Sequence, residues 1–176
     1  MKPTGQFILA ALPLALLVPG VAQAAGETAQ TEGSAKSTIV EPLQVVAVDD
    51  LRFGQILQPA ANGFLRVDPD GTITPQNGVV GQIGIAQTGT GRGPASFQVY
   101  TEVGRSFRVT LPNFINVTNG PASMRVQNFR TNVPGAGAVG DETGVFTLLI
   151  GARLRVLANQ AVGYYSGTFD VTVTYN

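Results

Sequence analysis

The sequence predicts an all-β domain. Turn-forming residues are abundant, with 22 glycines and 11 prolines, while charged residues make up only 12% of the chain. No segment shows a sustained helical period of apolar residues. Instead, short runs with one apolar face recur between Gly- and Pro-rich stretches, which is typical of successive β-strands joined by turns.

The clearest strand ends the sequence. Within residues 163–176, every second residue from Phe169 onward is apolar, and the last of the row is Tyr175. This alternation predicts a half-buried strand whose inward side chains are Phe169, Val171, Val173 and Tyr175. Because the sequence ends at Asn176, we expect the strand to pair with an earlier segment or with another molecule.

The first residues carry the pattern of a secretory signal peptide. A positive start at Lys2 precedes an apolar run of about a dozen residues, too short for a membrane-spanning helix. Ala22 and Ala24 stand in the small-x-small pattern of a cleavage site. We therefore predict that residues 1–24 are removed and that the protein is exported to the periplasm, the cell surface or the medium. No later run is long enough to give the mature chain an integral membrane segment.

The mature chain is expected to be one domain with a short tail. Residues 25–38 contain no apolar side chain larger than alanine and cannot offset their ordering entropy by burial, so we predict a flexible polar tail. Residues 39–176 then form a single domain. The 11 basic and 11 acidic residues balance, and no Lys or Arg cluster stands out. This argues against nucleic acid as a partner.

The first strand is predicted at residues 39–48. Ile39 begins it, and Leu43 and Val45 share one face, whereas Pro42 lacks a backbone donor and favours an edge position. A short strand is expected at residues 51–56. A hairpin is expected at residues 64–74, where Asp-Pro-Asp-Gly supplies the turn.

The later strands follow from the same alternation, and we predict a sandwich from their number. Residues 113–120 are expected to be an irregular crossing and residues 131–144 the longest loop. A long apolar run from Phe146 is expected either to bend at Gly151 or to form two strands. The remaining predicted strands are residues 79–86, 95–101, 106–111 and 122–129, with residues 102–105 as a hairpin-length connection. In all, eight to ten short, mostly antiparallel strands favour an immunoglobulin-like β-sandwich.

The sequence offers little catalytic chemistry. Histidine and cysteine are absent, which removes the commonest general base, the thiol nucleophile, the main transition-metal ligands and any disulfide. The acidic pairs all lie in predicted turns, where aspartate is favoured for local hydrogen bonds. These pairs are Asp49/Asp50, Asp68/Asp70 and Asp141/Glu142. We therefore predict no enzymatic activity, no cofactor and no metal site.

Several segments carry a resemblance to a known family. Residues 39–43 (IVEPL), 50–54 (DLRFG) and 151–154 (GARL), with the ending GYYSGTFDVTVTYN, resemble the bacterial exported family catalogued as domain of unknown function 4402. The resemblance implies a small exported β-sandwich without an established activity. The ending is also similar to that of spore-coat-U-like and chaperone-usher pilus subunits. The cysteine pair and the strongly apolar tail of ordinary pilus subunits are missing here.

Two functions are compatible with these observations. The first is a structural or adhesive subunit of a fimbria-like or other cell-surface assembly, which pairs with itself or with other surface subunits by strand addition. The strands expected to pair contain Ile39, Leu43, Val45 and the row from Phe169 to Tyr175. In this hypothesis residues 39–48 either pair within their own domain or complete a neighbour. The alternative is a monomeric periplasmic or secreted glycan-binding module that binds through loops such as 87–94 and 131–144.

One group of basic residues is predicted to lie together on an outward sheet face. We interpret it as a solvated face rather than a binding site. The group consists of Arg105, Arg108, Arg153 and Arg155.

Overall fold

The structure, a computed structural model, describes residues 43–80 and 91–176. These residues belong to one compact unit, Thr38–Asn176. The predicted signal peptide with Ala22 and Ala24, the predicted tail and Ile39 lie outside the described residues. Most of the predicted strand at 79–86 does so as well.

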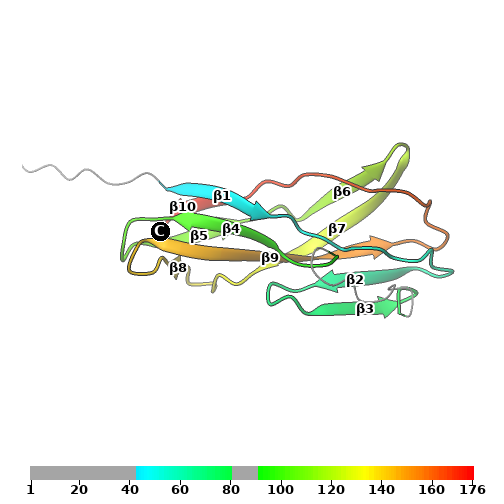
Figure 1. Cartoon of the computed structure of the whole chain (residues 1–176), viewed down its shortest axis with the longest axis horizontal. Helices are drawn as coiled ribbons and strands as arrows, with labels where there is room; N and C mark the ends of the chain where they lie inside the picture. Colours follow the sequence, from blue (N-terminus) through cyan, green and yellow to red (C-terminus); the bar gives the residue numbers. More distant parts are fainter. Residues whose placement is uncertain (1–42, 81–90) are drawn as a thin grey trace, which may run out of the picture. The chain divides into compact units, whose positions relative to one another are not determined.

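The described residues form an all-β fold of antiparallel strands in two sheets, which confirms the predicted fold class (Figure 1). The arrangement is sandwich-like, and the immunoglobulin-like topology stays a prediction. No helix in the described part of the chain is long and apolar enough to cross a membrane. The strands are β1 (Gln44–Asp49), β2 (Gly63–Val67), β3 (Ile73–Asn77), β4 (Ala95–Tyr100), β5 (Ser106–Thr110), β6 (Phe114–Asn119), β7 (Ala122–Thr131), β8 (Ala138–Val139), β9 (Val145–Val156) and β10 (Thr172–Tyr175).

The larger sheet is organised around β9. One edge of β9 pairs first with β4, where Ile150 lies opposite Ala95, and then with β2, where Ala152 lies opposite Val67. The other edge pairs with β7. β1, β3 and β6 extend the sheet beyond β4, β2 and β7. The long apolar run is thus a single strand of 12 residues, and what changes at Gly151 is its partner.

Close contact with the backbone at the end of β2 requires glycine at position 151. A Cβ atom at this position would lie 2.2 Å from the carbonyl oxygen of Val67 and 2.8 Å from the carbonyl carbon of Asp68. The end of β2 therefore passes directly over the backbone of β9. Even-numbered residues of β9 from Leu148 to Val156 are buried on both sides of this glycine, as the apolar parity predicted.

The smaller sheet has the order β10-β5-β8. β4 and β5 lie in different sheets, so the prediction that residues 102–105 connect a hairpin is wrong. Both edges of β4 are already occupied, by β1 and by β9. The short connection instead carries the chain from one sheet to the other, and the Thr101 N–H donates to the Gly144 carbonyl at 2.7 Å.

Two other local predictions differ from the structure. Residues 113–120 are not irregular but contain β6, whose Ile115 and Val117 pack inward while polar residues alternate with them. Residues 51–56 form no strand. Arg52 makes one isolated bridge to Gly93, after which Gly54 has φ of 64°, outside the β region. The predicted 64–74 hairpin does form, as β2 and β3, with Gly71 at φ of 85° in its turn.

Two hydrophobic clusters divide the interior. The first, here called the closed core, lies against β2, β7 and the second half of β9 and is covered by Leu51, Phe53, Ile56 and Val79 from outside the strands. The second, here called the open core, lies between the β1-β4-β9 region and the smaller sheet. Its fully buried members come from β4, β5, β8 and β9. They are Ala95, Val99, Phe107, Ala138, Leu148 and Ile150.

Candidate assembly interface

The C-terminal strand lies at an edge of the smaller sheet. β10 pairs with β5 in the register Val173 opposite Val109 and Tyr175 opposite Phe107. Only residues 172–175 form this ladder, although the alternation in the sequence starts at Phe169. Phe169 and Val171 approach the open core before the strand begins. The edge position makes β10 the terminal strand of its sheet as well as the last strand of the sequence.

The apolar row of this segment is only half-buried. Phe169, Val171, Val173 and Tyr175 all pack against the open core, and the polar residues between them are exposed. The ring of Phe169 lies 6.4 Å from that of Phe97 and 5.2 Å from that of Phe129. The row therefore faces inward as predicted from the alternation, and part of each apolar side chain stays accessible to water.

The hydrogen-bonding pattern shows which backbone groups of β10 face outward. The N–H of Asn176 donates to the carbonyl of Ser106 at 3.0 Å, in register with the β10–β5 ladder. In an antiparallel pair hydrogen-bonded residues alternate, so the N–H groups of Val173 and Tyr175 point away from β5. No described strand pairs with that edge.

β1 forms an edge of the larger sheet. It pairs with β4, with Val45 opposite Val99, so residues 44–49 pair within their own domain in this structure. Val45 is half-buried and packs against the open core, as does Leu43 just before the strand. The other residues of β1 are exposed, including Val46 and Val48. β1 is consequently a lightly buried strand with one open edge.

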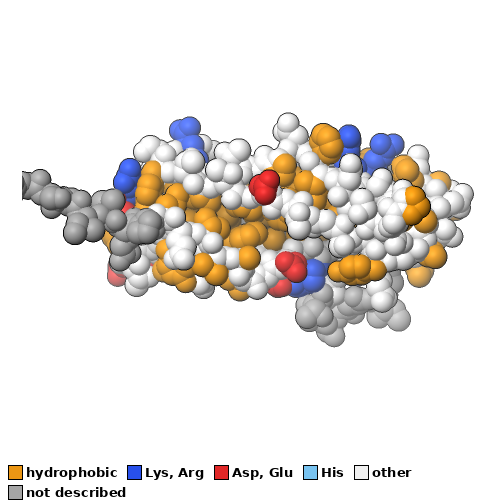
Figure 2. Space-filling view, turned by 90° about the horizontal axis from the view of Figure 1, so that it is seen from above, with side chains coloured by type: hydrophobic (Ala, Val, Ile, Leu, Met, Phe, Trp, Pro, Cys, Tyr) orange, Lys and Arg blue, Asp and Glu red, His pale blue; other side chains and the backbone are white. Residues whose placement is uncertain are grey.

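We call the half-buried apolar side chains of the first and last strand segments, with the open strand edges beside them, the seam. These side chains are Leu43, Val45, Phe169, Val171, Val173 and Tyr175. Figure 1 draws β1 and β10 along the same side of the described unit, and side chains of both segments pack against the open core. Seen from that side, hydrophobic side chains form a nearly continuous band at the surface (Figure 2). A band of half-buried apolar side chains between two unpaired strand edges is suited to accept an extended segment.

The end of the seam is fixed by Tyr175. Its Oη accepts a hydrogen bond from the N–H of Glu102 at 2.8 Å, which ties the last strand to the crossing between the sheets. The guanidinium of Arg105 lies 4.0 Å from the centre of the Tyr175 ring. Arg105 and Arg108 lie just before and on β5 of the smaller sheet, so they do not form one stripe with Arg153 and Arg155 of β9, and that prediction is wrong.

The turn before β10 is held by Tyr165. Its hydroxyl donates to the carbonyl of Ala161 at 2.6 Å and accepts from the side chain of Gln160 at 2.9 Å. Ser166 then pairs with Thr118 in an isolated bridge. The neighbouring Tyr164 is 84% exposed. The two adjacent tyrosines thus differ, since Tyr165 stabilises the turn and Tyr164 projects into solvent.

At least one carboxylate of each acidic pair is held by local contacts. Asp49 pairs with Arg52, and this hydrogen bond lowers the pKa of Asp49. The N–H of Thr72 lowers the pKa of Asp70. The pKa of Asp141 is lowered most by the hydroxyl of Thr143 and then by the N–H groups of Val145 and Thr143. Within residues 43–80 and 91–176, no three acidic side chains gather as a metal site.

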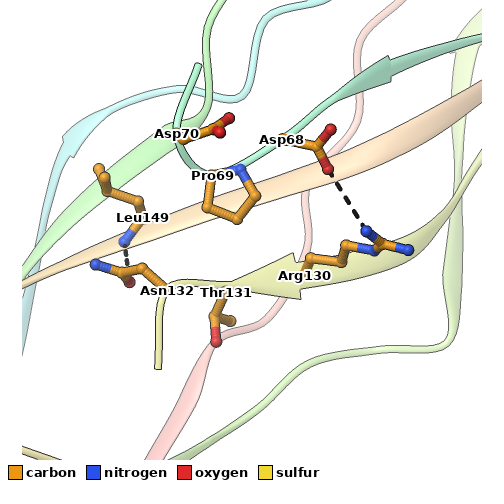
Figure 3. A pocket seen from close by; sticks show the side chains of 7 residues that line it. All are labelled: Asp68, Pro69, Asp70, Arg130, Thr131, Asn132 and Leu149. Carbon is orange, nitrogen blue, oxygen red and sulfur yellow. Dashed lines mark hydrogen bonds and ion pairs between the residues drawn. The ribbon is translucent and has the colours of Figure 1, made fainter. Parts of the chain in front are cut away.

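A shallow hollow lies beside the β2–β3 turn (Figure 3). Asp68 on its rim is paired with Arg66 at 2.9 Å and with Arg130 at 3.7 Å. On the opposite side, Asn132 Oδ1 accepts from the Leu149 N–H at 2.9 Å, and its Nδ2 donates to the Thr147 carbonyl at 2.9 Å. The Asn132 side chain thus covers the edge of β9. We infer a structural role for this hollow, because its charged and amide groups are already paired.

Sequence reasoning found the apolar rows of the seam but not its geometry. The alternation identified Leu43, Val45 and the row from Phe169, and Pro42 favoured an edge position for the first strand, but the strands that pair with the two segments could not be predicted. It also missed Arg66, Arg125 and Arg130, which the strand register brings to the same sheet face as Arg153 and Arg155. Residue parity within each strand was available, whereas the pairing of distant strands was not.

Comparison with known proteins places the chain in a family. The model of a family described as a domain of unknown function, DUF4402, matches residues 43–175. The chain belongs to this family, as its sequence resemblance had indicated. Neither the curated proteins nor the solved structures contain a significant match.

Proposed function

We propose that this DUF4402 chain is a non-enzymatic structural or adhesive subunit of a fimbria-like or other cell-surface assembly, joined to its neighbours by strand addition at the seam. The observation that carries the proposal is the seam itself. Its apolar side chains are half-buried, and the outer edges of β1 and β10 have no partner among the described strands. An added strand would satisfy the edge hydrogen bonds and cover the apolar band.

The added strand comes, in the simplest assembly, from another copy of the chain. Residues 25–38 are a poor donor because they carry no large apolar side chain. Residues 39–48 are a better one, since Ile39, Leu43 and Val45 share one face of an extended strand. β1 is lightly buried in its own domain, so its transfer to a neighbour gives up few apolar contacts.

The predicted export supports the same role. A signal peptide delivers the chain to compartments in which surface assemblies form. Several of the described carboxylates are engaged in turns and ion pairs, whereas the seam combines apolar surface with strand edges that have no partner among the described strands.

Substitution of Val173 by proline tests the proposal. The Val173 N–H points away from β5, so Val173→Pro removes a donor of the open edge and leaves the β10–β5 hydrogen bonds in place. The mature chain, residues 25–176, should give detergent-resistant ladders on unheated denaturing gels or fibres by negative-stain microscopy. The Val173→Pro protein should stay monomeric with an unchanged circular dichroism spectrum.

Val173→Ala is the matched control, because it shortens the same side chain but keeps the N–H. It should still assemble, with ladders that are weaker but present. A chain lacking residues 25–48 should lose the ladders. The proposal is overturned if the native chain remains monomeric at high concentration, or if Val173→Pro assembles as readily as the native chain.

A further inference from the structure

The outer face of the larger sheet gathers most of the arginines described in the domain. Core-facing residues of β2, β7 and β9 alternate with residues that point to the opposite side of the sheet. The register places Arg125 of β7 opposite Arg155 of β9, and Arg153 of β9 opposite Arg66 of β2. Arg130 of β7 lies opposite Gly151, further along the same face. We call this surface the arginine face. It consists of Arg66, Arg125, Arg130, Arg153 and Arg155.

The positive charge of this face is only partly neutralised. Asp68 pairs with Arg66 at 2.9 Å and with Arg130 at 3.7 Å. Among the described residues, Arg125, Arg153 and Arg155 take part in no ion pair. Like charges directly opposite each other in a sheet are destabilising. The Arg125–Arg155 pair therefore adds no stability of its own, and a bound anion would relieve the repulsion between the two groups.

Aromatic rings hold two of these guanidinium groups in place. The Arg125 guanidinium lies 4.0 Å from the centre of the Phe114 ring, and that of Arg153 lies 4.2 Å from the centre of the Phe64 ring. Phe114 is 47% exposed. The Nε of Arg153 is buried and has no hydrogen-bond partner within the described part of the chain. Stacking limits the motion of the arginines, so less freedom is lost when they bind an anion.

The geometry of the face favours an extended ligand. Neighbouring strands lie roughly 5 Å apart, and residues on one face of a strand repeat every ~7 Å. The guanidinium groups are thus spread over a sheet surface at intervals of the order of one sugar ring, rather than gathered in a pocket. A guanidinium group can bind a carboxylate through two parallel hydrogen bonds, and Arg125, Arg153 and Arg155 are in no ion pair within the described residues. Such a surface can contact several units of a polymer at once.

We propose that the arginine face binds an acidic polysaccharide, a chain of sugar rings that carries carboxylates. Charge complementarity and the spacing of the guanidinium groups select this ligand. A membrane surface is less suitable, because the charged groups lie on a sheet face that carries few exposed apolar side chains, and one face of each of the Phe64 and Phe114 rings is already stacked on a guanidinium group. The inference does not depend on strand addition at the seam. It also places polysaccharide binding on a sheet face and not on the loops that the sequence favoured.

The test uses the mature chain, residues 25–176, and alginate oligosaccharides as the carboxylated probe in isothermal titration calorimetry. The double variant Arg125→Gln/Arg155→Gln should bind at least about tenfold more weakly, because each substitution removes a charge-assisted hydrogen bond. Affinity of the native chain should fall as salt is raised. Arg108→Gln is the matched control, since Arg108 is exposed on β5 in the other sheet. It should bind like the native chain.

Other probes decide the ligand class. Neutral dextran oligosaccharides should not bind, and single-stranded DNA and anionic lipid vesicles should bind more weakly than alginate. Equal binding of DNA or vesicles would overturn the assignment to a polysaccharide. So would the absence of saturable alginate binding, or an equal loss of affinity in Arg108→Gln. Val173→Pro should keep its alginate affinity, so failure of the assembly proposal leaves this one open to its own test.

Discussion

The closed and open cores differ in how completely one chain covers them. In the closed core, Leu65 and Val79 are 0% exposed and Val126 is 1% exposed, and segments outside the strands complete the cover. In the open core, the deepest residues are equally buried, with Val99 and Leu148 at 0%. The rows along β1 and β10, however, stay half-exposed.

This difference suggests that the two cores have different roles in the domain. In the closed core, strands flank β9 on both sides, and the half-buried apolar side chains are spread over β3, β6, β7 and residues 51–56. The open core keeps apolar surface beside two unpaired strand edges, an arrangement that isolated soluble domains usually avoid. We infer that the closed core provides most of the stability of the subunit and that the open core provides the place where a partner would add.

The largest effect is expected from matched valine truncations in the two cores. Val126→Ala should lower the free energy of unfolding by about 2 kcal/mol, because it removes two buried methyl groups and leaves a cavity. Val173→Ala should cost about 1 kcal/mol or less, since Val173 is half-buried and water can fill the space. Urea denaturation with equal slopes measures both values. Equal losses would contradict the distinction between the cores.

A smaller effect is expected from Tyr175→Phe at the end of the seam. The substitution keeps the ring over which Arg105 stacks but removes the oxygen that accepts from the Glu102 N–H. The loss should be about 1 kcal/mol, the typical net value of one hydrogen bond. Hydrogen exchange should show faster exchange of the Glu102 amide and of β10, with β2 and β7 unchanged. Equal acceleration in all four segments would contradict a local role for Tyr175.

The sequence predicted those parts of the fold that depend on local alternation. The even-numbered apolar residues of β9, the turn at Asp68–Gly71 and the inward row from Phe169 to Tyr175 each follow from a pattern within a few residues. β6 was missed because Asn116, Thr118 and Asn119, residue types that also favour loops, alternate with or follow its inward Ile115 and Val117.

Features that depend on distant pairing were beyond such patterns. The short 102–105 connection looks the same whether it joins strands of one sheet or of two, and only the occupation of both edges of β4 decides between them. The arginine face was likewise invisible, because Arg66 and Arg153 are far apart in sequence and meet only through the β2–β9 register. The candidate seam was predictable in its residues and not in its position.

The smallest effect compares two aspartate turns, one beside each core. The pKa of Asp141, before β9 in the open half, is held below its ordinary value of 3.8 chiefly by the Thr143 hydroxyl. The pKa of Asp70, in the β2–β3 turn, is lowered chiefly by the Thr72 N–H. A carboxyl whose pKa is lower in the folded state stabilises the fold fully above its unfolded pKa, and this contribution is lost as the pH falls through the folded value. Asp141→Asn and Asp70→Asn should therefore each weaken the dependence of stability on pH below about pH 4, a change that urea denaturation at several acidic pH values would detect.

Hydrogen exchange separates the two turns. If the part of the domain around the open core unfolds locally before the part around the closed core, only Asp141→Asn should also change the pH dependence of hydrogen exchange in β8. An equal change from Asp70→Asn would mean that the two halves open together and that the seam is no more mobile than the rest of the domain.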